Sequence, residues 1–308
     1  MIVSYNSEQV IEACLEGVHS MAPGTSAIVV DNASQDQTVT RARKFAGVEV
    51  IANTANRGFA AAANQGFRDT RAEFILLLNP DVRLRTPIEG LTAAAQENGL
   101  SAGLLIDEAG AAQTGFSVRR LPTPSALALE LLGINRLWSG NPVNRRYRCL
   151  DVDLSGESYV EQPAGAFLTI RRDVWEKLGG FDEGFYPVWF EDVDFCKRAL
   201  EAGYKIRYVP AARGTHIGGH SVHRLPTDRK ASFWYGSLLR YAAKHFSGWG
   251  YRLVGLAAAF SCAPRMVAGM FEERSLKPIP TYTGIFFSSL KLLWGRRGTY
   301  RPGPGERA

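Results

Sequence analysis

The sequence lacks the marks of several protein classes. Its 308 residues include only 4 cysteines and 5 histidines. Cys14, Cys149, Cys196 and Cys262 form no C-x-x-C pair, and their spacing fits neither a zinc ribbon nor a disulfide framework. We therefore expect buried free thiols in a reducing compartment. The chain has no zinc finger, no basic DNA-reading helix and no aromatic ribonucleoprotein signature, which argues against nucleic acid as a partner.

A secretory signal and a long uninterrupted apolar run are also missing. The chain opens directly on a strand-like segment, so we expect a cytoplasmic protein. The apolar stretch Leu253–Met270 falls short of the ~20 clean apolar residues that span a bilayer, because Pro264 and Arg265 interrupt it. Together with 285–294 and its flanking cations, it predicts peripheral membrane contact through 253–297, at the inner face of the cell membrane. Packing on the core or in a homo-oligomer is the alternative.

What is present is an ordinary globular composition with an uneven distribution of charge. Apolar residues make up 45% and charged residues 21%, which predicts a sizeable buried core. The formal net charge is +6, and the last 38 residues hold seven basic and three acidic side chains, a balance of +4. A basic tail of this kind suits an anionic membrane surface or an anionic substrate.

The first hundred residues alternate between strand and helix signals. Strands are predicted at Met1–Ser4, 27–30, 48–52 and 74–78, with helices at 7–19, 34–43 and 58–67 between them. This βαβαβαβ order predicts a mostly parallel sheet flanked by helices. Ligands of such sheets bind at the carboxyl ends of the strands. The polar clusters that follow the strands are Tyr5-Asn6, Asp31-Asn32, Asn53 to Gly58, and Asn79-Pro80-Asp81.

The remainder of the chain is less regular. A short helix at 127–132 and a long surface excursion at 135–151 are expected in the middle third. Strands at 165–170 and 206–209 and helices at 172–178, within 189–203, and at 231–245 follow. We therefore predict an α/β catalytic domain over 1–245, with halves 1–105 and 106–245, and a helical, basic C-terminal extension over 246–308.

Asp81 and His216 are candidate metal ligands. Asp81 follows five buried apolar residues and a proline, and a carboxylate at the mouth of such a strand is well placed to hold a divalent cation. Taken alone, Asn-Pro-Asp is better interpreted as a turn. His216 follows strand 206–209, and imidazole binds transition-type cations, although a satisfied histidine is the better interpretation in isolation. A zinc site with His220 and His223 is disfavoured, because Gly218-Gly219 breaks any helix there.

Two further segments carry charges suited to catalysis or anion binding. Glu191, Asp192 and Asp194 precede a helix and follow an aromatic stretch, so desolvation is expected to make one of them a better base; an acidic first helical turn is the alternative. The Asn56-Arg57-Gly58 segment opens a helix, whose free N–H groups and added cation suit an anion, although a plain glycine turn explains it equally well.

Taken together, the segments resemble the family 2 glycosyltransferases, which have the GT-A fold, and among them the bacterial rhamnosyltransferase group. The matching stretches occur in family order from residue 2 to about 245. They are Val3-Ser4-Tyr5-Asn6-Ser7, Val29-Val30-Asp31-Asn32-Ala33-Ser34, Asn56-Arg57-Gly58-Phe59-Ala60, Leu77-Leu78-Asn79-Pro80-Asp81, Gly165-Ala166-Phe167, Gly179-Gly180-Phe181-Asp182-Glu183, Glu191-Asp192-Val193-Asp194 and His216-x-Gly218-Gly219-x-Ser221. No single stretch is specific, but the ordered set is.

The resemblance implies roles for these residues. Asp81 and His216 would hold Mg²⁺ or Mn²⁺, with Asn79 in place of the first carboxylate of the family's D-x-D motif. Asp192 would be the catalytic base, with Glu191 as the less favoured choice, and Asp31 would read the nucleobase. The expected nucleotide-sugar contacts are Ser4, Tyr5, Asn6, Asp31, Asn56, Arg57, Gly58, Asn64, Asn79 and Asp81.

The activity implied is inverting sugar transfer by a single in-line displacement, with positioning and leaving-group electrostatics supplying most of the rate. The expected donor is dTDP-rhamnose, and the expected acceptor is a hydroxyl of a saccharide or lipid-linked intermediate in cell-envelope polysaccharide synthesis. A nucleotidyltransferase that forms nucleotide sugars would want a glycine-rich basic loop where Ser4-Tyr5-Asn6-Ser7 stands. A non-catalytic membrane-surface binding protein would not need Asp81, Asp192 and His216 together.

Overall fold

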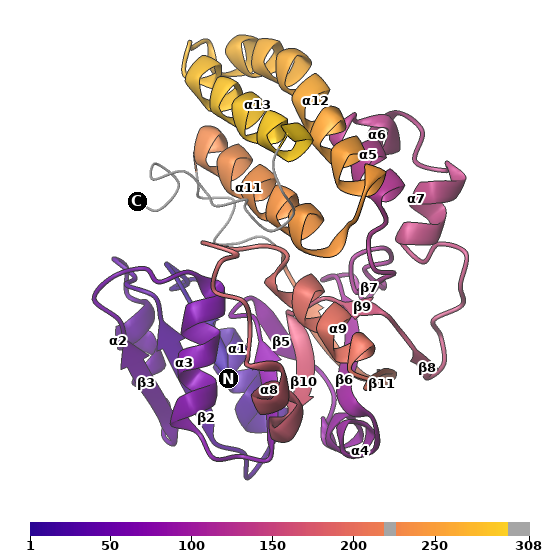
Figure 1. Ribbon diagram of the computed structural model, residues 1–308. Coiled ribbons are helices and arrows are strands. Elements are labelled where there is room, and N and C mark those ends of the chain that lie inside the picture. Colours follow the sequence, from indigo (N-terminus) through magenta and orange to yellow (C-terminus); the bar gives the residue numbers. More distant parts are fainter. Residues whose placement is uncertain (219–225, 295–308) are drawn as a thin grey trace. The chain divides into compact units, whose positions relative to one another are not determined.

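The computed structural model describes residues 1–218 and 226–294, which fall into two compact units (Figure 1). The sheet unit comprises Met1–Leu121, Arg148–Gly184 and Glu191–Arg224. The helical unit comprises Pro122–Tyr147, Phe185–Phe190 and Leu225–Ala308. The predicted domain limits at 105 and 245 stay predictions, although helix 227–245 groups with the C-terminal helices rather than with the sheet.

The sheet unit is built on one mixed, mostly parallel sheet, as predicted. Its strands are β1 (Ile2–Ser4), β2 (Ala27–Asp31), β3 (Val48–Ala52), β4 (Phe74–Leu78), β5 (Val82–Leu84), β6 (Gly99–Ile106), β8 (Ser158–Tyr159), β10 (Phe167–Arg171) and β11 (Lys205–His216). The order is β3-β2-β1-β4-β10-β6-β11-β5, with β8 beside β11. β1 to β4 run parallel, whereas β10 is antiparallel to both β4 and β6. A small second sheet pairs β7 (Val118–Arg119) with β9 (Gln162–Pro163).

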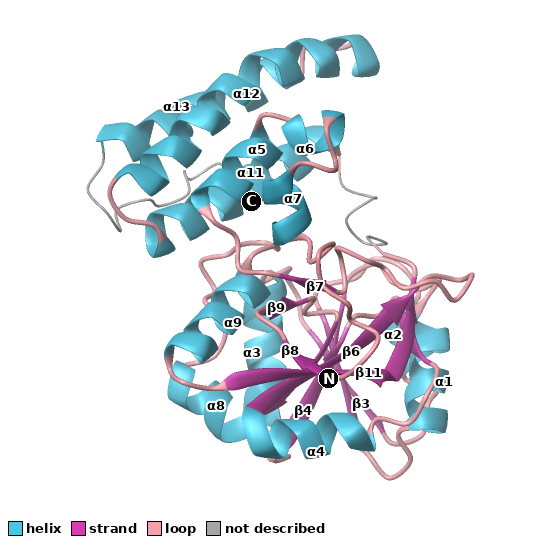
Figure 2. Ribbon diagram, turned by 90° about the vertical axis from the view of Figure 1, so that its right-hand side faces the viewer, coloured by secondary structure: helices cyan, strands magenta, loops and turns pink. Residues whose placement is uncertain are grey.

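Helices cover both faces of this sheet (Figure 2). Helices α3 (Phe59–Asp69), α8 (Arg172–Leu178) and α9 (Glu191–Glu201) bury their apolar side chains against one face. Helices α1 (Ile11–Met21), α2 (Thr38–Ala42) and α4 (Glu89–Asn98) cover the other. The four cysteines are buried free thiols, as predicted.

Two predicted boundaries in the sheet unit are wrong in instructive ways. Helix α1 begins at Ile11 and not at Ser7, because the Ser7 hydroxyl donates to the Tyr5 carbonyl and holds a turn ahead of the helix. Strand β11 does not end at Val209. A bulge between Val209 and Arg213 resets its register, and the strand continues to His216 beside β5 and β6.

The helical unit contains α5 (Pro124–Leu131), α6 (Ile134–Leu137), α7 (Pro142–Tyr147), α11 (Thr227–His245), α12 (Trp249–Glu273) and α13 (Pro278–Trp294). The expected surface excursion over 135–151 is therefore partly helical. Helix α12 continues through Pro264 and packs against α5, α11 and α13. Part of the predicted basic tail, residues 295–308 with Arg296 and Arg297, lies outside the described residues.

Replacing Phe67 with alanine should destabilise the sheet unit by about 3–5 kcal/mol, because it empties a fully buried site. The Phe67 ring stacks on the Trp175 ring with 5.0 Å between ring centroids, and it packs edge-on against the Phe181 ring with 6.1 Å between centroids. Urea unfolding followed by circular dichroism measures the change. The neighbouring exposed Arg68→Ala is the control and should shift stability by less than about 0.5 kcal/mol. Equal effects of the two substitutions would contradict this account of the core.

Candidate functional site

Asp31 joins the carboxyl ends of β1 and β2. Its Oδ1 accepts hydrogen bonds from the Ser4 hydroxyl at 2.8 Å and the Ser34 hydroxyl at 2.6 Å, and its Oδ2 accepts from the Ser34 N–H at 2.8 Å. Asp31 is 1% exposed and Ser4 is completely buried. The Ser4 hydroxyl is thus used inside the protein to fix Asp31, and the predicted contact of Ser4 with the nucleotide sugar stays a prediction.

The loops beside Asp31 leave two predicted contacts accessible. Tyr5 and Asn6 are half-buried, and Asn6 adopts a left-handed conformation with φ of 49°. The Asn6 Oδ1 accepts from the Gln35 N–H at 2.8 Å, and its own N–H donates to the Ser34 hydroxyl at 2.7 Å. These bonds tie the loop after β1 to the loop after β2 and fix both at one edge of the sheet.

The amino end of α3 is held by asparagines. The Asn32 side chain donates to the Gly58 carbonyl at 3.1 Å and accepts from the Arg57 N–H at 3.0 Å, while the Asn56 Oδ1 accepts from the Gly58 N–H at 2.9 Å. Gly58 has φ of +81°, a conformation that favours glycine. The Arg57 side chain is exposed, so the cation stays available to an anion near this helix end.

Asn64 has a structural place instead of the predicted donor contact. Its side-chain nitrogen donates to the Phe181 carbonyl and to Glu183 Oε1, and its oxygen accepts from the Phe181 N–H at 2.9 Å. The residue is 4% exposed. Because these bonds use the amide to anchor α3 to the loop after α8, we leave Asn64 out of the proposed site.

Asp81 and His216 meet at the junction of β5 and β11. His216 lies opposite Val82 in the ladder between β11 and β5, and Val82 directly follows Asp81 in the sequence. The Nε2 atom of His216 is 3.6 Å from Asp81 Oδ1. His216 is 2% exposed and Asp81 7%. The Gly218 N–H donates to Asp81 Oδ2 at 3.2 Å. The two predicted metal ligands are therefore neighbours, although they are 135 positions apart in the chain.

Gln113 fixes the tautomer of His216, and sequence reasoning missed it. Its side-chain nitrogen donates to the His216 carbonyl at 2.7 Å, so its oxygen is the acceptor for the ring Nδ1–H at 2.8 Å. Nε2 therefore presents a lone pair, and it has no hydrogen-bond partner among the described residues. Burial lowers the pKa of His216, opposed by the nearby Asp81 charge, and the Phe116 ring stacks on the imidazole at 5.1 Å.

A buried lone pair beside a carboxylate fits a bound cation. The neutral imidazole of His216 has no proton on Nε2 to donate to the Asp81 carboxylate 3.6 Å away, and the carboxylate has no proton to donate to Nε2. Nitrogen and oxygen donors together suit Mn²⁺ or a similar divalent ion. Within 1–218 and 226–294 there is no cluster of three or more His, Cys, Asp or Glu side chains. His220 and His223, set aside above as zinc ligands, lie outside the described residues.

Asp192 lies at the amino end of α9 and is tied to β10. Its Oδ2 accepts from the Gly165 N–H at 2.9 Å, and its Oδ1 accepts from the Val193 N–H at 2.8 Å. A Cβ on Gly165 would lie 2.8 Å from the Asp192 Cβ, so only glycine permits this approach. The neighbouring Ala166 carbonyl accepts from the Asn79 N–H at 3.0 Å. Asp192 is thereby linked through the main chain to the segment that carries Asp81.

The acidic residues of α9 differ in environment. Glu191 is 5% exposed, and burial, followed by the charge of Asp192, raises its pKa well above the ordinary value. Burial also raises the pKa of Asp192, opposed by its two backbone hydrogen bonds and by Arg119, yet the residue is partly exposed. Asp194 is completely buried and forms an ion pair with Arg198 at 2.8 Å. Asp192 is thus the accessible carboxylate of elevated pKa.

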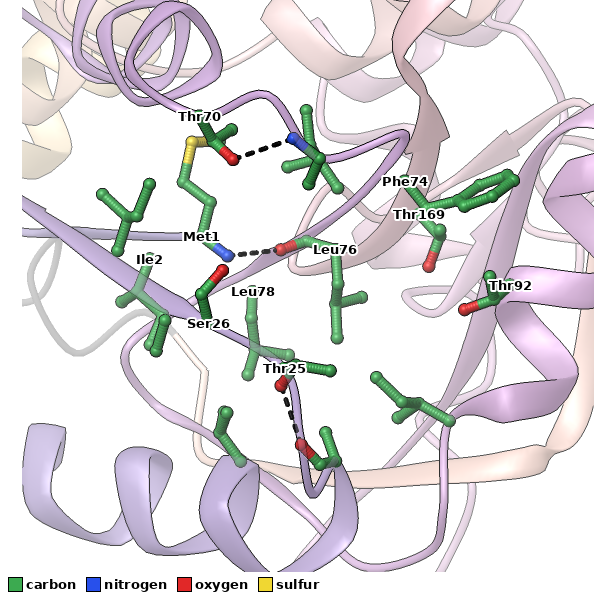
Figure 3. A pocket seen from close by; sticks show the side chains of 17 residues that line it. Met1, Ile2, Thr25, Ser26, Thr70, Phe74, Leu76, Leu78, Thr92 and Thr169 are labelled. Carbon is green, nitrogen blue, oxygen red and sulfur yellow. Dashed lines mark hydrogen bonds between the residues drawn. The ribbon is translucent and has the colours of Figure 1, made fainter. Parts of the chain in front are cut away.

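A cavity at the other edge of the sheet has different chemistry (Figure 3). Met1, Ala27 and Phe74 line it, at the amino ends of β1, β2 and β4. No described residue of its lining has a charged side chain. Since nucleotide ligands bind parallel sheets at the opposite edge, this cavity is not the predicted site.

Comparison with known proteins identifies related families and folds. Residues 1–123 match the glycosyl transferase family 2 model, and residues 150–223 match the model described as N-terminal domain of galactosyltransferase. The chain is 28% identical over 240 residues to N-acetylglucosaminyl-diphospho-decaprenol L-rhamnosyltransferase of Mycobacterium tuberculosis, which covers 73% of this chain and 76% of that protein. It is 26% identical over 256 residues to rhamnosyltransferase WbbL of Escherichia coli K12, and this match covers 79% of this chain and 92% of that protein.

Solved structures with the same fold include two enzymes crystallised with nucleotides and Mn²⁺. GalNAc-T7 with UDP, GalNAc and Mn²⁺ superposes with a TM-score of 0.56 at 15% identity, over 98% of this chain and 57% of that one. The mannosyltransferase PcManGT from Pyrobaculum calidifontis in complex with GDP-Man and Mn²⁺ superposes with a TM-score of 0.51 at 15% identity. The match covers 96% of this chain and 86% of that one. These likenesses establish the GT-A fold that the sequence predicted.

The raised pKa of Glu191 predicts a pH-dependent stability. A buried carboxyl that keeps its proton in the folded state contributes fully below its ordinary pKa of 4.5, and its contribution falls as pH rises toward the folded pKa, by about 1.4 kcal/mol per pH unit. Glu191→Gln removes this group, so its stability relative to wild type should increase between pH 5 and pH 8. Urea midpoints across that range measure the effect. The exposed Glu97→Gln serves as control and should track wild type; a constant Glu191→Gln difference would contradict the prediction.

Proposed function

Because the chain is a rhamnosyltransferase-like member of glycosyl transferase family 2, we propose that it moves a sugar from a nucleoside diphosphate to a hydroxyl of a saccharide or lipid-linked acceptor. The observation that carries the proposal is the pairing of Asp81 with His216 at 3.6 Å, with Asp192 held by Gly165, the neighbour of the residue that bonds to Asn79. The names of the relatives support rhamnose as the transferred sugar. We propose dTDP-rhamnose as the donor and cell-envelope polysaccharide synthesis as the setting.

The donor nucleotide would bind at the carboxyl ends of β1 and β2. Asp31 orders the loops there, and in our proposal Tyr5 and Asn6 supply accessible contacts to the base or ribose. The exposed Arg57 and the free N–H groups of α3, behind Asn56 and Gly58, suit the diphosphate. Asn79 is a further proposed donor contact, because it directly follows β4 and its N–H donates to the Ala166 carbonyl.

Asp81 and His216 would hold a divalent cation, Mg²⁺ or Mn²⁺. When bound there, the ion supplies positive charge to the departing diphosphate. Gln113 would keep the Nε2 lone pair of His216 aimed at the site, and the neutral imidazole follows from the pKa that burial lowers.

Asp192 is the proposed base. It is the more accessible of the two neighbouring carboxylates, and its elevated pKa favours proton uptake from an acceptor hydroxyl. As the hydroxyl oxygen bonds to the anomeric carbon and the diphosphate leaves from the opposite side, the proton passes to Asp192 and the configuration inverts. Glu191, 5% exposed, is the less favoured base.

Asp192→Asn should keep nucleotide-sugar binding and lose sugar transfer by at least about 100-fold, because an amide cannot accept the proton. The assay is a panel of nucleotide sugars, each titrated by calorimetry with Mn²⁺ and then incubated with lipid-linked saccharide acceptors. Asp194→Asn is a poor control because it breaks the ion pair with Arg198, so the exposed Asp69→Asn at the end of α3 is used. Full turnover by Asp192→Asn would sink the base assignment, and no nucleotide-sugar binding by wild type would sink the function.

Gln113→Leu should weaken Mn²⁺ binding by about tenfold or more, because the His216 ring loses the partner that fixes its orientation. Gln113→Glu keeps an acceptor for the Nδ1–H and should retain most of the affinity. Titration of Mn²⁺ followed by electron paramagnetic resonance gives the dissociation constants. The exposed Gln96→Leu on α4 is the matched control, and equal Mn²⁺ affinity in Gln113→Leu and wild type would refute the positioning role.

A further inference from the structure

Helix α12 exposes a row of apolar side chains along one face. The row, which we call the α12 stripe, consists of Trp249, Leu253, Leu256, Phe260, Val267 and Phe271. Successive members are three, four or seven residues apart, which at 3.6 residues per turn places all six within an arc of about 60°. The exposed fraction is 79% for Trp249 and Phe271 and 72% for Phe260. An apolar row of about 33 Å is unusual on a water-facing helix.

The rest of α12 is fixed within the helical unit. Val254, Ala258 and Cys262 are buried, and they fall on the side of the helix away from the stripe. The Tyr235 hydroxyl of α11 bonds to the Ser261 hydroxyl at 2.7 Å, and Arg265 Nη2 donates to the Leu131 carbonyl of α5 at 3.1 Å. The stripe is therefore a surface of a packed helix, and the core of the unit does not require it.

We infer that the α12 stripe lies in the interface of an anionic membrane, with the helix axis along the surface. Exposed Trp, Phe and Leu flanked by cations are typical of interfacial helices. Residues 249–294 hold five basic and two acidic side chains, and Arg274, Lys277 and Lys291 are exposed. Trp249 carries the Arg252 guanidinium over its ring at 5.3 Å, which joins an apolar and a cationic group at one end of the stripe.

A spanning orientation and a second copy explain the stripe less well. By length and composition α12 is the one described helix able to cross a membrane, but Pro264 and Arg265 interrupt its apolar sequence and its other face packs on protein. In a symmetric dimer the same patch faces itself, so the cations beside the stripe would repel one another. An anionic lipid surface satisfies both the apolar row and the cations.

The test uses the full chain in flotation with phosphatidylcholine vesicles, with and without phosphatidylglycerol. Wild type should float with the anionic vesicles, and Phe260→Ser/Phe271→Ser should bind them at least about tenfold more weakly. The matched control is Leu137→Ser/Trp138→Ser on α6, which removes apolar side chains of 89% and 62% exposure away from the stripe and should bind as wild type. Arg274→Glu/Lys277→Glu should lose the preference for anionic lipid.

Three results would overturn the inference. One is equal vesicle binding by Phe260→Ser/Phe271→Ser and wild type. Another is wild type that ignores vesicles yet sediments as a dimer that this variant converts to a monomer, which makes the stripe a subunit contact. The third is wild type that stays with the vesicles through an alkaline wash, which indicates a spanning helix. No nucleotide sugar is present in these measurements, so their outcome is independent of whether the protein transfers sugar.

Discussion

The antiparallel pairing of β10 with β4 is the constraint on which the site depends. β10 lies between the parallel strands that begin the chain and the strands β6, β11 and β5 that complete the sheet. Its register sets Phe167 opposite Leu78, so Ala166 bonds to Asn79 and the adjacent Gly165 receives Asp192. A slip of one residue would reverse the faces of β10 and separate these groups. The candidate base and the candidate metal ligand are thus placed by one strand ladder.

A second constraint is the extension of β11 past its bulge. Without the register change between Val209 and Arg213, the strand would not bring His216 opposite Val82. Gln113 then acts on both the main chain and the ring of His216, which leaves one nitrogen lone pair beside Asp81. The Asp81 carboxylate and the Nε2 lone pair of His216 are thus buried close together. Burying such groups without a proton or cation between them costs free energy.

The sequence predicted the sheet and the residues of its loops because those signals are local. Runs such as Phe74–Leu78 and Val48–Ala52 matched the observed strands in full. The position of Asp81 at a strand end followed from the same pattern. Gln113 could not be found this way, because it lies in an irregular segment and matters only through its contact with a residue 103 positions away. Ser4 and Asn64 lie beside predicted site residues in the sequence, but only the structure shows that their polar groups form hydrogen bonds inside the protein.

Backbone groups hold much of the candidate site. Asp192 bonds to the Gly165 N–H, Asp81 to the Gly218 N–H, and Asn79 donates its own N–H to a carbonyl. Any residue supplies such groups, so most positions around the site are free to vary as long as the strands keep their register. The exception is Gly165, where a Cβ would collide with Asp192. The geometry of the candidate site therefore depends more on the register of the strands than on the side chains around it.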